Sequence, residues 1–270
     1  MALPSHFHTD AAIAGLAAGK HVVVEKPMAT SLADADRMVA AAAEADTVLS
    51  IFQNRRYNPD FVKVRSLIDA GIFGRIVQVR ITESRFGRRW DWQTQRKFGG
   101  GTLNNTCPHF LDQALQLFGP TEPDVFCHLD RTLTLGDADD HVKVVLKGDG
   151  APTIDVEVSS ACAYPGETWN IMGTQGGLAA PPGTALEMVR PSPVAAAELD
   201  FNPTPDRSYN RDEIPWQEGS WSLDEDDTPG YAGYYLDLVR HHPQRRLAVT
   251  PESVRRVIWL QETCHAMAGF

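Results

Sequence analysis

The sequence predicts an α/β segment followed by an α+β segment, and three observations lead to this fold class. Val22–Val24 is a continuous apolar run between two helix-patterned stretches, as expected of a parallel strand buried on both faces. Residues 48–52, apolar except for Ser50, predict a second buried strand one helix later. Between residues 123 and 189, short β-patterned runs follow one another with only turn residues between them, which is typical of an antiparallel sheet.

Helix signals lie between and after these strands. Ser31 and Asp34 form a capping box ahead of a helix that crosses between the two apolar strands. A second, amphipathic helix begins near Asp60 and is ended by Gly71. The remaining predicted segments are a strand at residues 74–86, helices at 105–117, 231–241 and 251–268, and an irregular stretch at 191–230.

Charge and composition exclude several classes of function. The chain has 25 basic and 35 acidic residues, a net charge of −10, whereas nucleic-acid and membrane-surface partners need a basic face. No apolar run approaches the roughly 18 residues of a membrane span and no leader is recognisable, so a cytoplasmic location is expected. The four cysteines are widely spaced, which predicts neither a zinc site nor a disulfide framework. His6 and His8 have no third ligand nearby, so no metal is expected.

Polar residues follow each predicted parallel strand at its carboxyl end. Glu25, Lys26 and Pro27 come directly after the first strand, and Asn54 lies just past the second. Ligands of open α/β sheets bind outside this end of the strands, so these side chains are candidates for a binding site. For the first stretch taken alone, an ordinary strand end with a solvated lysine is the alternative.

Two longer stretches resemble the signatures of a known family. Residues 17–29, AAGKHVVVEKPMA, resemble the first signature of the Gfo/Idh/MocA oxidoreductases, the relatives of glucose–fructose oxidoreductase and inositol dehydrogenase. Residues 99–112, GGGTLNNTCPHFLD, resemble the second signature, GGG-L-D-G-H-D. The resemblance implies an NAD(P)-dependent oxidoreductase whose small-molecule substrate is a sugar, an inositol or a related polyol.

The resemblance also implies roles for individual residues. It places Lys26 at the junction of cofactor and substrate, where its charge stabilises a developing alkoxide, and His109 over the reacting hydroxyl as the base. Asn105 stands where the motif has Asp, so we expect it to orient the His109 ring without charge and to leave that ring less basic. A core histidine is the alternative for His109. The residues implied to contact an NAD or NADP cofactor are Pro4, His8, Glu25, Lys26 and Asn54.

The sequence contains no glycine-rich turn of the kind that binds a dinucleotide. No G-x-G-x-x-G precedes residue 20, and the glycine runs at 99–101 and 173–177 have the wrong spacing. We therefore expect residues 1–72 to form a partial Rossmann domain, a doubly wound parallel sheet lacking its first βα units, with weakened dinucleotide binding. Residues 73–270 are expected to form a substrate-binding and oligomerisation domain with a large, mostly antiparallel sheet covered by helices. The missing βα units have two explanations: a misplaced translation start or partial gene, or a functional short form.

The loop after the first strand of this second domain is dense in groups that recognise polyhydroxylated ligands. Arg89, Trp90 and Trp92 lie close together in it. Aromatic faces stack on the C–H surfaces of sugars, and arginine donates hydrogen bonds to hydroxyl groups. With Asn105 and His109, these residues form the predicted substrate site. A structural loop whose tryptophans close the core is the alternative.

Two hypotheses of different classes result. The first is a dehydrogenase that forms a homo-oligomer through the sheet of its second domain. The second is a non-catalytic oligomeric or sugar-binding protein without a cofactor site. Binding of NADH or NADPH distinguishes the two.

Overall fold

The polypeptide forms two sheets with helices between them in a computed structural model of the chain, which describes residues 2–180, 186–191, 202, 214–222, 230–241 and 247–269. None of the described helices combines the length and the apolar character needed to span a bilayer. The strands are β1 (Val22–Val24), β2 (Leu49–Ile51), β3 (Ile76–Ser84), β4 (Asp124–Asp130), β5 (His141–Lys147), β6 (Thr153–Ser159), β7 (Trp169–Gly173), β8 (Gly176–Ala180), β9 (Leu186–Pro191) and β10 (Trp216–Trp221). The α-helices are α1 (His8–Ala17), α2 (Leu32–Glu44), α3 (Pro59–Asp69), α4 (Thr102–Asn105), α5 (Cys107–Phe118), α6 (Tyr231–His241) and α7 (Pro251–Ala268).

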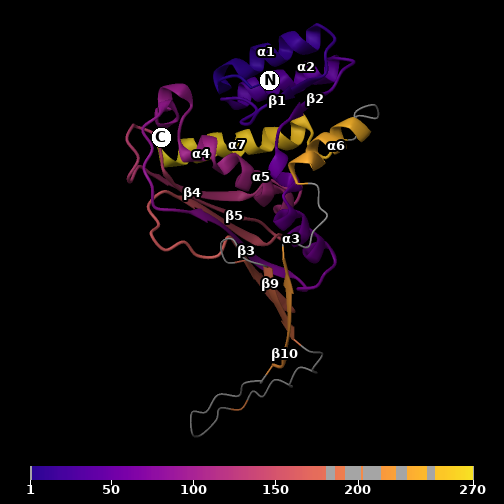
Figure 1. Ribbon diagram of the computed structural model, residues 1–270, viewed down its shortest axis with the longest axis vertical. Helices are drawn as coiled ribbons and strands as arrows, with labels where there is room; N and C mark the ends of the chain where they lie inside the picture. Colours follow the sequence, from indigo (N-terminus) through magenta and orange to yellow (C-terminus); the bar gives the residue numbers. More distant parts are fainter. Residues whose placement is uncertain are drawn as a thin grey trace.

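The smaller sheet is a parallel pair at one end of the molecule. β1 and β2 run in the same direction, with Val22 opposite Leu49, and α1 and α2 lie beside them (Figure 1). The hydroxyl of Ser31 caps α2 by accepting a hydrogen bond from the backbone N–H of Asp34 at 3.1 Å. The predicted order of strand, helix and parallel strand is confirmed, and it constitutes part of a Rossmann fold.

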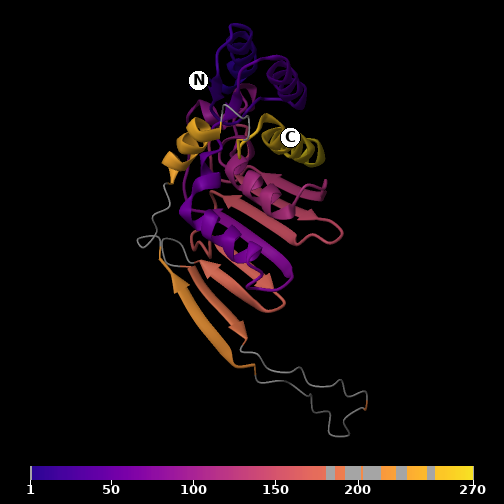
Figure 2. The ribbon, with the colours of Figure 1, turned by 90° about the vertical axis from the view of Figure 1, so that its right-hand side faces the viewer.

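The larger sheet has eight strands in the order β10-β9-β8-β7-β3-β6-β5-β4. Neighbouring strands pair antiparallel, except that β3 and β6 run parallel with Ile81 opposite Val156. β9 and β10 lie at the edge farthest from the parallel pair (Figure 2). The predicted large, mostly antiparallel sheet is therefore confirmed.

The sequence does not predict two strands of this sheet. β8 consists of glycine and alanine with one leucine. Glycine and alanine have little strand preference, so pairing with β7 and β9 holds this strand in place. β10 lies in the stretch 191–230 that we expected to be irregular. Its side chains are exposed or half-buried throughout, so no alternating pattern marks it as a strand. Residues 192–201, 203–213 and 223–229 of that stretch lie outside the described residues.

The closing helix α7 packs against both sheets because it has two apolar faces. Val254 and Ile258 belong to the core around β1 and β2, whereas Val257, Leu260 and Cys264 belong to the core of the larger sheet. Spacings of three and four residues make each set a continuous stripe along the helix, and the two stripes lie side by side. The helix consequently lies between the two sheets (Figure 1).

The helix predicted at residues 105–117 is interrupted. The chain forms α4, a turn at Thr106 and then α5, which begins at Cys107. Pro108 has no N–H with which to continue the hydrogen-bond ladder of a single helix. Asn105 and His109, which the prediction placed in one helix, therefore lie in two.

Candidate active site

The turn after β1 brings the first motif into contact with the second. The Nζ atom of Lys26 donates to the backbone oxygen of Asn105 at 2.5 Å and to its side-chain Oδ1 at 3.1 Å. That backbone oxygen lies at the end of α4, where a helix leaves its last carbonyl groups without partners of its own. The peptide bond between Lys26 and Pro27 is cis. Residues 79 positions apart in the sequence thus meet at one point.

Lys26 carries its charge in an unfavourable environment. Burial lowers the pKa of Lys26, because a charged group loses solvation there. The carboxylate of Glu25 raises this pKa, while the positive charges of Arg55 and Arg89 lower it further. The net lowering means that the site favours either the loss of a proton or the arrival of a negative group.

His109 lies in the first turn of α5 and is only 9% exposed. Burial, together with the positive charges of Lys26 and Arg55, lowers the pKa of His109 to about 3. Its Nδ1 atom is buried and has no hydrogen-bond partner among the described residues. At neutral pH the ring is therefore neutral, and it retains unused hydrogen-bonding capacity.

Asn105 does not orient the ring of His109 as we expected. Its Oδ1 accepts from Lys26, and its Nδ2 donates to Oε1 of Gln93 at 3.0 Å, so other groups use both ends of the amide. The pKa of His109 is lowered, which is the expected direction, but the causes are burial and two nearby cations. Asn105 therefore hydrogen-bonds to Lys26 and not to His109.

His8 is the predicted cofactor residue whose role the structure corrects. It is buried, and its ring nitrogens lie 2.8 Å from the carbonyl oxygen of Pro27 and 2.9 Å from that of Leu3. Both ring nitrogens face backbone carbonyl oxygens, one of them in the turn that carries Lys26, so the ring packs against that turn. No group of three or more His, Cys, Asp or Glu side chains among the described residues is arranged to hold a metal ion.

Two of the other predicted cofactor residues, Glu25 and Asn54, lie past the ends of β1 and β2. Pro4 is exposed and precedes a short helix, Ser5–Phe7. Glu25 is half-buried next to Lys26. Asn54 follows β2, and its Oδ1 atom is buried without a hydrogen-bond partner among the described residues. Such an atom is costly unless a donor reaches it.

The predicted substrate loop places its aromatic side chains in solvent. Trp90 is 77% exposed and Trp92 is 47% exposed, the latter edge-on to Phe98 with 6.4 Å between ring centroids. The alternative in which these tryptophans close the core is therefore wrong. Arg89 donates to Oε1 of Gln93 at 2.5 Å, which connects this loop to the surroundings of Lys26.

Sequence reasoning left several residues near the site without a role. Arg55 and Arg56 follow β2, and surface positions are an equally good interpretation of the sequence. The structure has Arg55 lowering the pKa of Lys26 and buries Arg56 in an ion pair with Asp112 at 2.6 Å. Gln93 carries no signal at all, because one glutamine in a polar loop has no distinguishing pattern.

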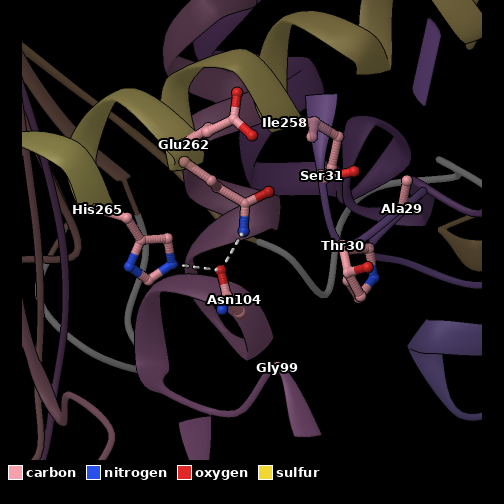
Figure 3. A pocket seen from close by; sticks show the side chains of 10 residues that line it. Ala29, Thr30, Ser31, Gly99, Asn104, Ile258, Glu262 and His265 are labelled. Atoms are coloured by element: carbon pink, nitrogen blue, oxygen red, sulfur yellow. Dashed lines mark hydrogen bonds between the residues drawn. The ribbon is translucent and has the colours of Figure 1, made fainter. Parts of the chain in front are cut away.

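Two cavities lie beside the turn of Lys26. The smaller has a volume of about 60 Å³ and a mixed lining of apolar side chains, such as Ile258, and polar ones. Figure 3 shows Asn104 in its wall, where Oδ1 lies 3.1 Å from Nε2 of His265 and 3.2 Å from Nε2 of Gln261. A more open cavity of about 360 Å³ adjoins it. Neither is lined by Lys26 or His109, so these two residues form a separate feature.

The fold and parts of the sequence are similar to those of known proteins. The crystal structure of an NAD-binding protein from Listeria innocua has a TM-score of 0.80 and 23% identity, covering 100% of this chain and 78% of that one. YdgJ of Escherichia coli (strain K12), an uncharacterized oxidoreductase, is 40% identical over 121 residues, or 43% of this chain and 34% of that protein. The scyllo-inositol 2-dehydrogenase (NADP(+)) IolW of Bacillus subtilis (strain 168) is 34% identical over 118 residues, with coverage of 43% and 33%. The matches thus span about a third of the length of these two relatives.

Family-level comparison covers both parts of the chain. Residues 1–53 match a family described as "Oxidoreductase family, NAD-binding Rossmann fold". Residues 61–179 match the "GFO/IDH/MocA C-terminal domain". Each match contains one of the two motifs, in the predicted order. The chain is therefore a member of the Gfo/Idh/MocA family of NAD-binding oxidoreductases.

Proposed function

We propose that this protein transfers a hydride between a nicotinamide cofactor and a hydroxyl-bearing carbon of a sugar, an inositol or a related polyol. The observation that carries the proposal is the meeting of the two motifs: Lys26 is bonded to Asn105, and its charge lowers the pKa of His109. A half-buried cation beside a buried, neutral imidazole provides the groups that oxidation of a secondary alcohol requires. The name of the relative IolW, a scyllo-inositol 2-dehydrogenase, supports the substrate class.

His109 accepts the hydroxyl proton in the proposed reaction. Its low pKa keeps the ring neutral, so a nitrogen lone pair is available at neutral pH. The same low pKa makes the imidazolium unfavourable beside Lys26 and Arg55. The negative charge that develops on the substrate oxygen offsets this cost while the proton is transferred.

Lys26 stabilises that developing negative charge. Its ammonium group is held by the two oxygens of Asn105, which fixes its position before substrate arrives. Burial makes the interaction with an alkoxide stronger than it would be in water, because the local dielectric constant is lower. The lowered pKa of Lys26 reflects the same environment, which an incoming negative charge would relieve.

The residues present fit the nicotinamide end of a dinucleotide. Oδ1 of Asn54 and Nδ1 of His109 are buried atoms without partners among the described residues, as expected where a ligand would supply them. Glu25, Lys26 and Asn54 would hold the nicotinamide and its ribose, and Pro4 is proposed to contact the cofactor as well. When bound, the cofactor accepts or supplies the hydride. NAD and NADP are both proposed; the name of IolW gives NADP(+) for that relative.

The loop with Arg89, Trp90 and Trp92 is proposed to contact the substrate. The exposure of both tryptophans supports this role, because their faces are free to stack on a sugar ring. Asn105 and His109 would complete the substrate site from the helices of the second motif.

The larger sheet is proposed to carry contacts between copies of the chain. Phe126 on β4 is 57% exposed and Met172 on β7 is 38% exposed, which supports association through the sheet. We further propose a domain boundary near residue 72 and a cytoplasmic location. The four cysteines are free thiols, which suits a reducing compartment.

Two measurements test the proposed function. The first is titration with NADH and with NADPH, followed by tryptophan fluorescence, and the second is the initial rate on scyllo-inositol, myo-inositol and common aldoses. We expect saturable binding of at least one dinucleotide and turnover of at least one polyol. His109→Leu should abolish turnover, whereas His128→Leu, the same change on the exposed face of β4, should not. Sugar binding without any dinucleotide binding would support the non-catalytic hypothesis instead.

A further inference from the structure

A chain of polar side chains links Lys26 to Arg89. Nζ of Lys26 donates to Oδ1 of Asn105 at 3.1 Å, and Nδ2 of Asn105 donates to Oε1 of Gln93 at 3.0 Å. Nη2 of Arg89 donates to the same oxygen of Gln93 at 2.5 Å. Two amides thus stand between two cations.

The two cations set the orientation of both amides. Lysine and arginine only donate hydrogen bonds, whereas an amide has one end that accepts and one end that donates. Asn105 must therefore turn its oxygen to Lys26, which leaves its NH₂ group in need of an acceptor. Gln93 turns its oxygen to Arg89, and that same oxygen meets the NH₂ group of Asn105. Only this orientation of the two amides gives each of the three hydrogen bonds a donor and an acceptor.

We propose that Gln93 is a positioning residue that keeps the amide oxygen of Asn105 on Lys26. The inference deepens the proposed function and rests on it, because the orientation matters for hydride transfer only if Lys26 acts there. A carboxylate at position 105 would present an oxygen to Lys26 in either orientation. An amide does so in only one of its two orientations, so Asn105 needs a partner that selects it.

The side chain of Gln93 is not what holds its own loop. The backbone N–H of Gln93 donates to Oδ1 of Asp91 at 2.9 Å, and its backbone oxygen accepts from the N–H of Gly101 at 2.9 Å. Arg89 has a second partner in Asp91, at 2.9 Å. None of these bonds involves the Gln93 side chain, so the loop is expected to keep its shape when that side chain is replaced.

The pKa of Lys26, measured in the full chain without substrate or cofactor, tests this inference. The ¹³C resonance of the lysine ε-carbon reports the titration, and Lys26→Arg assigns it. Gln93→Leu removes the acceptor, and we expect it to lower the pKa of Lys26 by roughly one unit, since a hydrogen bond to a charged group weakens. The charged and titratable neighbours of Lys26 are Glu25, Arg55, Arg89 and His109, and the variant replaces none of them. Arg89 loses its bond to Gln93 but keeps its ion pair with Asp91.

Asn105→Asp provides the decisive background. There the replacement Gln93→Leu should shift the pKa of Lys26 by less than about 0.3 units, because a carboxylate needs no orienting partner. Gln95→Leu, the same change two residues along, is the matched control and should have no effect in either background. Equal shifts by Gln93→Leu in both backgrounds, or no shift in the native one, would overturn the inference.

Activity provides a second readout that separates this inference from the proposed function. In an active protein, Gln93→Leu should lower kcat about tenfold without raising KM for the dinucleotide, and Asn105→Asp should restore most of it. A protein that turns over no polyol but shows the background-dependent pKa shift would disprove the dehydrogenase and leave the amide orientation established. An active protein without that shift would support the dehydrogenase and disprove the role of Gln93.

Discussion

Two basic side chains reach from the amino-terminal part of the chain to the helices of the second motif, and they are held in opposite ways. Arg56 meets the carboxylate of Asp112 through two hydrogen bonds, of 2.7 Å and 2.6 Å. Lys26 meets the amide and the backbone oxygen of Asn105. Both contacts cross the same junction, but only the first pairs a positive charge with a negative one.

The difference appears in the pKa values of the two cations. Burial acts against the charge of Arg56, but Asp112 outweighs it and the pKa of Arg56 is raised. Burial lowers the pKa of Lys26, whose direct partners are neutral. A compensated charge fixes structure, whereas an uncompensated one remains ready to stabilise the negative charge of a ligand. The following predictions test this contrast, beginning with the largest expected effect.

Replacing Arg56 should be the most damaging change to stability. Arg56→Met leaves the carboxylate of Asp112 buried without its partner, and we expect a loss of about 3–5 kcal/mol in the free energy of unfolding, measured by urea denaturation. Arg56→Met with Asp112→Leu should recover much of this loss. Arg65→Met, which breaks the exposed pair of Arg65 with Asp69, should cost less than about 1 kcal/mol. Equal costs for the buried and exposed pairs would contradict the structural role of Arg56.

Replacing Lys26 should affect activity rather than stability. Lys26→Met removes the cation that would stabilise the alkoxide, and we expect kcat to fall by about 10²–10³-fold. The free energy of unfolding should stay the same or rise, because a poorly compensated buried charge is lost. Lys20→Met, at an exposed position before β1, is the control for both measurements. A Lys26→Met protein that unfolds readily would place Lys26 with Arg56 as a structural cation.

His109 should make stability sensitive to acid. Its pKa is about 3 in the folded protein and near 6.5 when unfolded, so the unfolded chain binds a proton below pH 6.5 that the folded one does not. Stability is therefore lost as pH falls from 6.5 towards 3, by roughly 2–3 kcal/mol at pH 4.5. Asp139, whose pKa burial raises to about 6, acts in the opposite direction over part of this range.

The effect of His109 must therefore be measured as a difference between proteins. His109→Gln should be more resistant than the native chain to lowering the pH from 7 to 4.5, by the same roughly 2–3 kcal/mol. His128→Gln, on the exposed face of β4, should match the native chain. Parallel stability curves for the native chain and His109→Gln would show that the ring titrates normally.

Asn105→Asp should make the contact of Lys26 resemble that of Arg56. The added carboxylate would raise the pKa of Lys26 by roughly one unit and raise that of His109 as well. In an active enzyme, the acidic limb of the pH–rate profile should move to higher pH. An unchanged profile would mean that neither group controls the rate.

Much of the fold could be predicted because the signals are local. Val22–Val24 is apolar throughout, Ser31 lies three residues before Asp34, and the strands from β3 to β7 alternate along their length. The break at Thr106 could also have been predicted, because Pro108 cannot continue a helix. β10 could not have been, because its side chains are exposed or half-buried and it depends on pairing with β9 and on Trp221, at its end, packing against the core.

The candidate site could be predicted only in its residue types. Lys26 and His109 follow from the motifs, and the structure brings them into one electrostatic environment. The partner of the Asn105 amide was predicted wrongly, because the resemblance pointed to His109 while Gln93 comes from a separate loop. His8 was assigned to the cofactor for a similar reason, although its ring nitrogens face two backbone carbonyls.

The sequence by itself determined the order of strands and helices and supplied a lysine and a histidine at motif positions, because strand and helix patterns depend on near neighbours. Only the tertiary structure decided what those two side chains are like chemically. Burial and nearby charges set a pKa, and for Lys26 and His109 they come from groups far apart in the sequence, such as Arg55 and Arg89. The same amino acids at a solvent-exposed strand end would have ordinary pKa values and no common site.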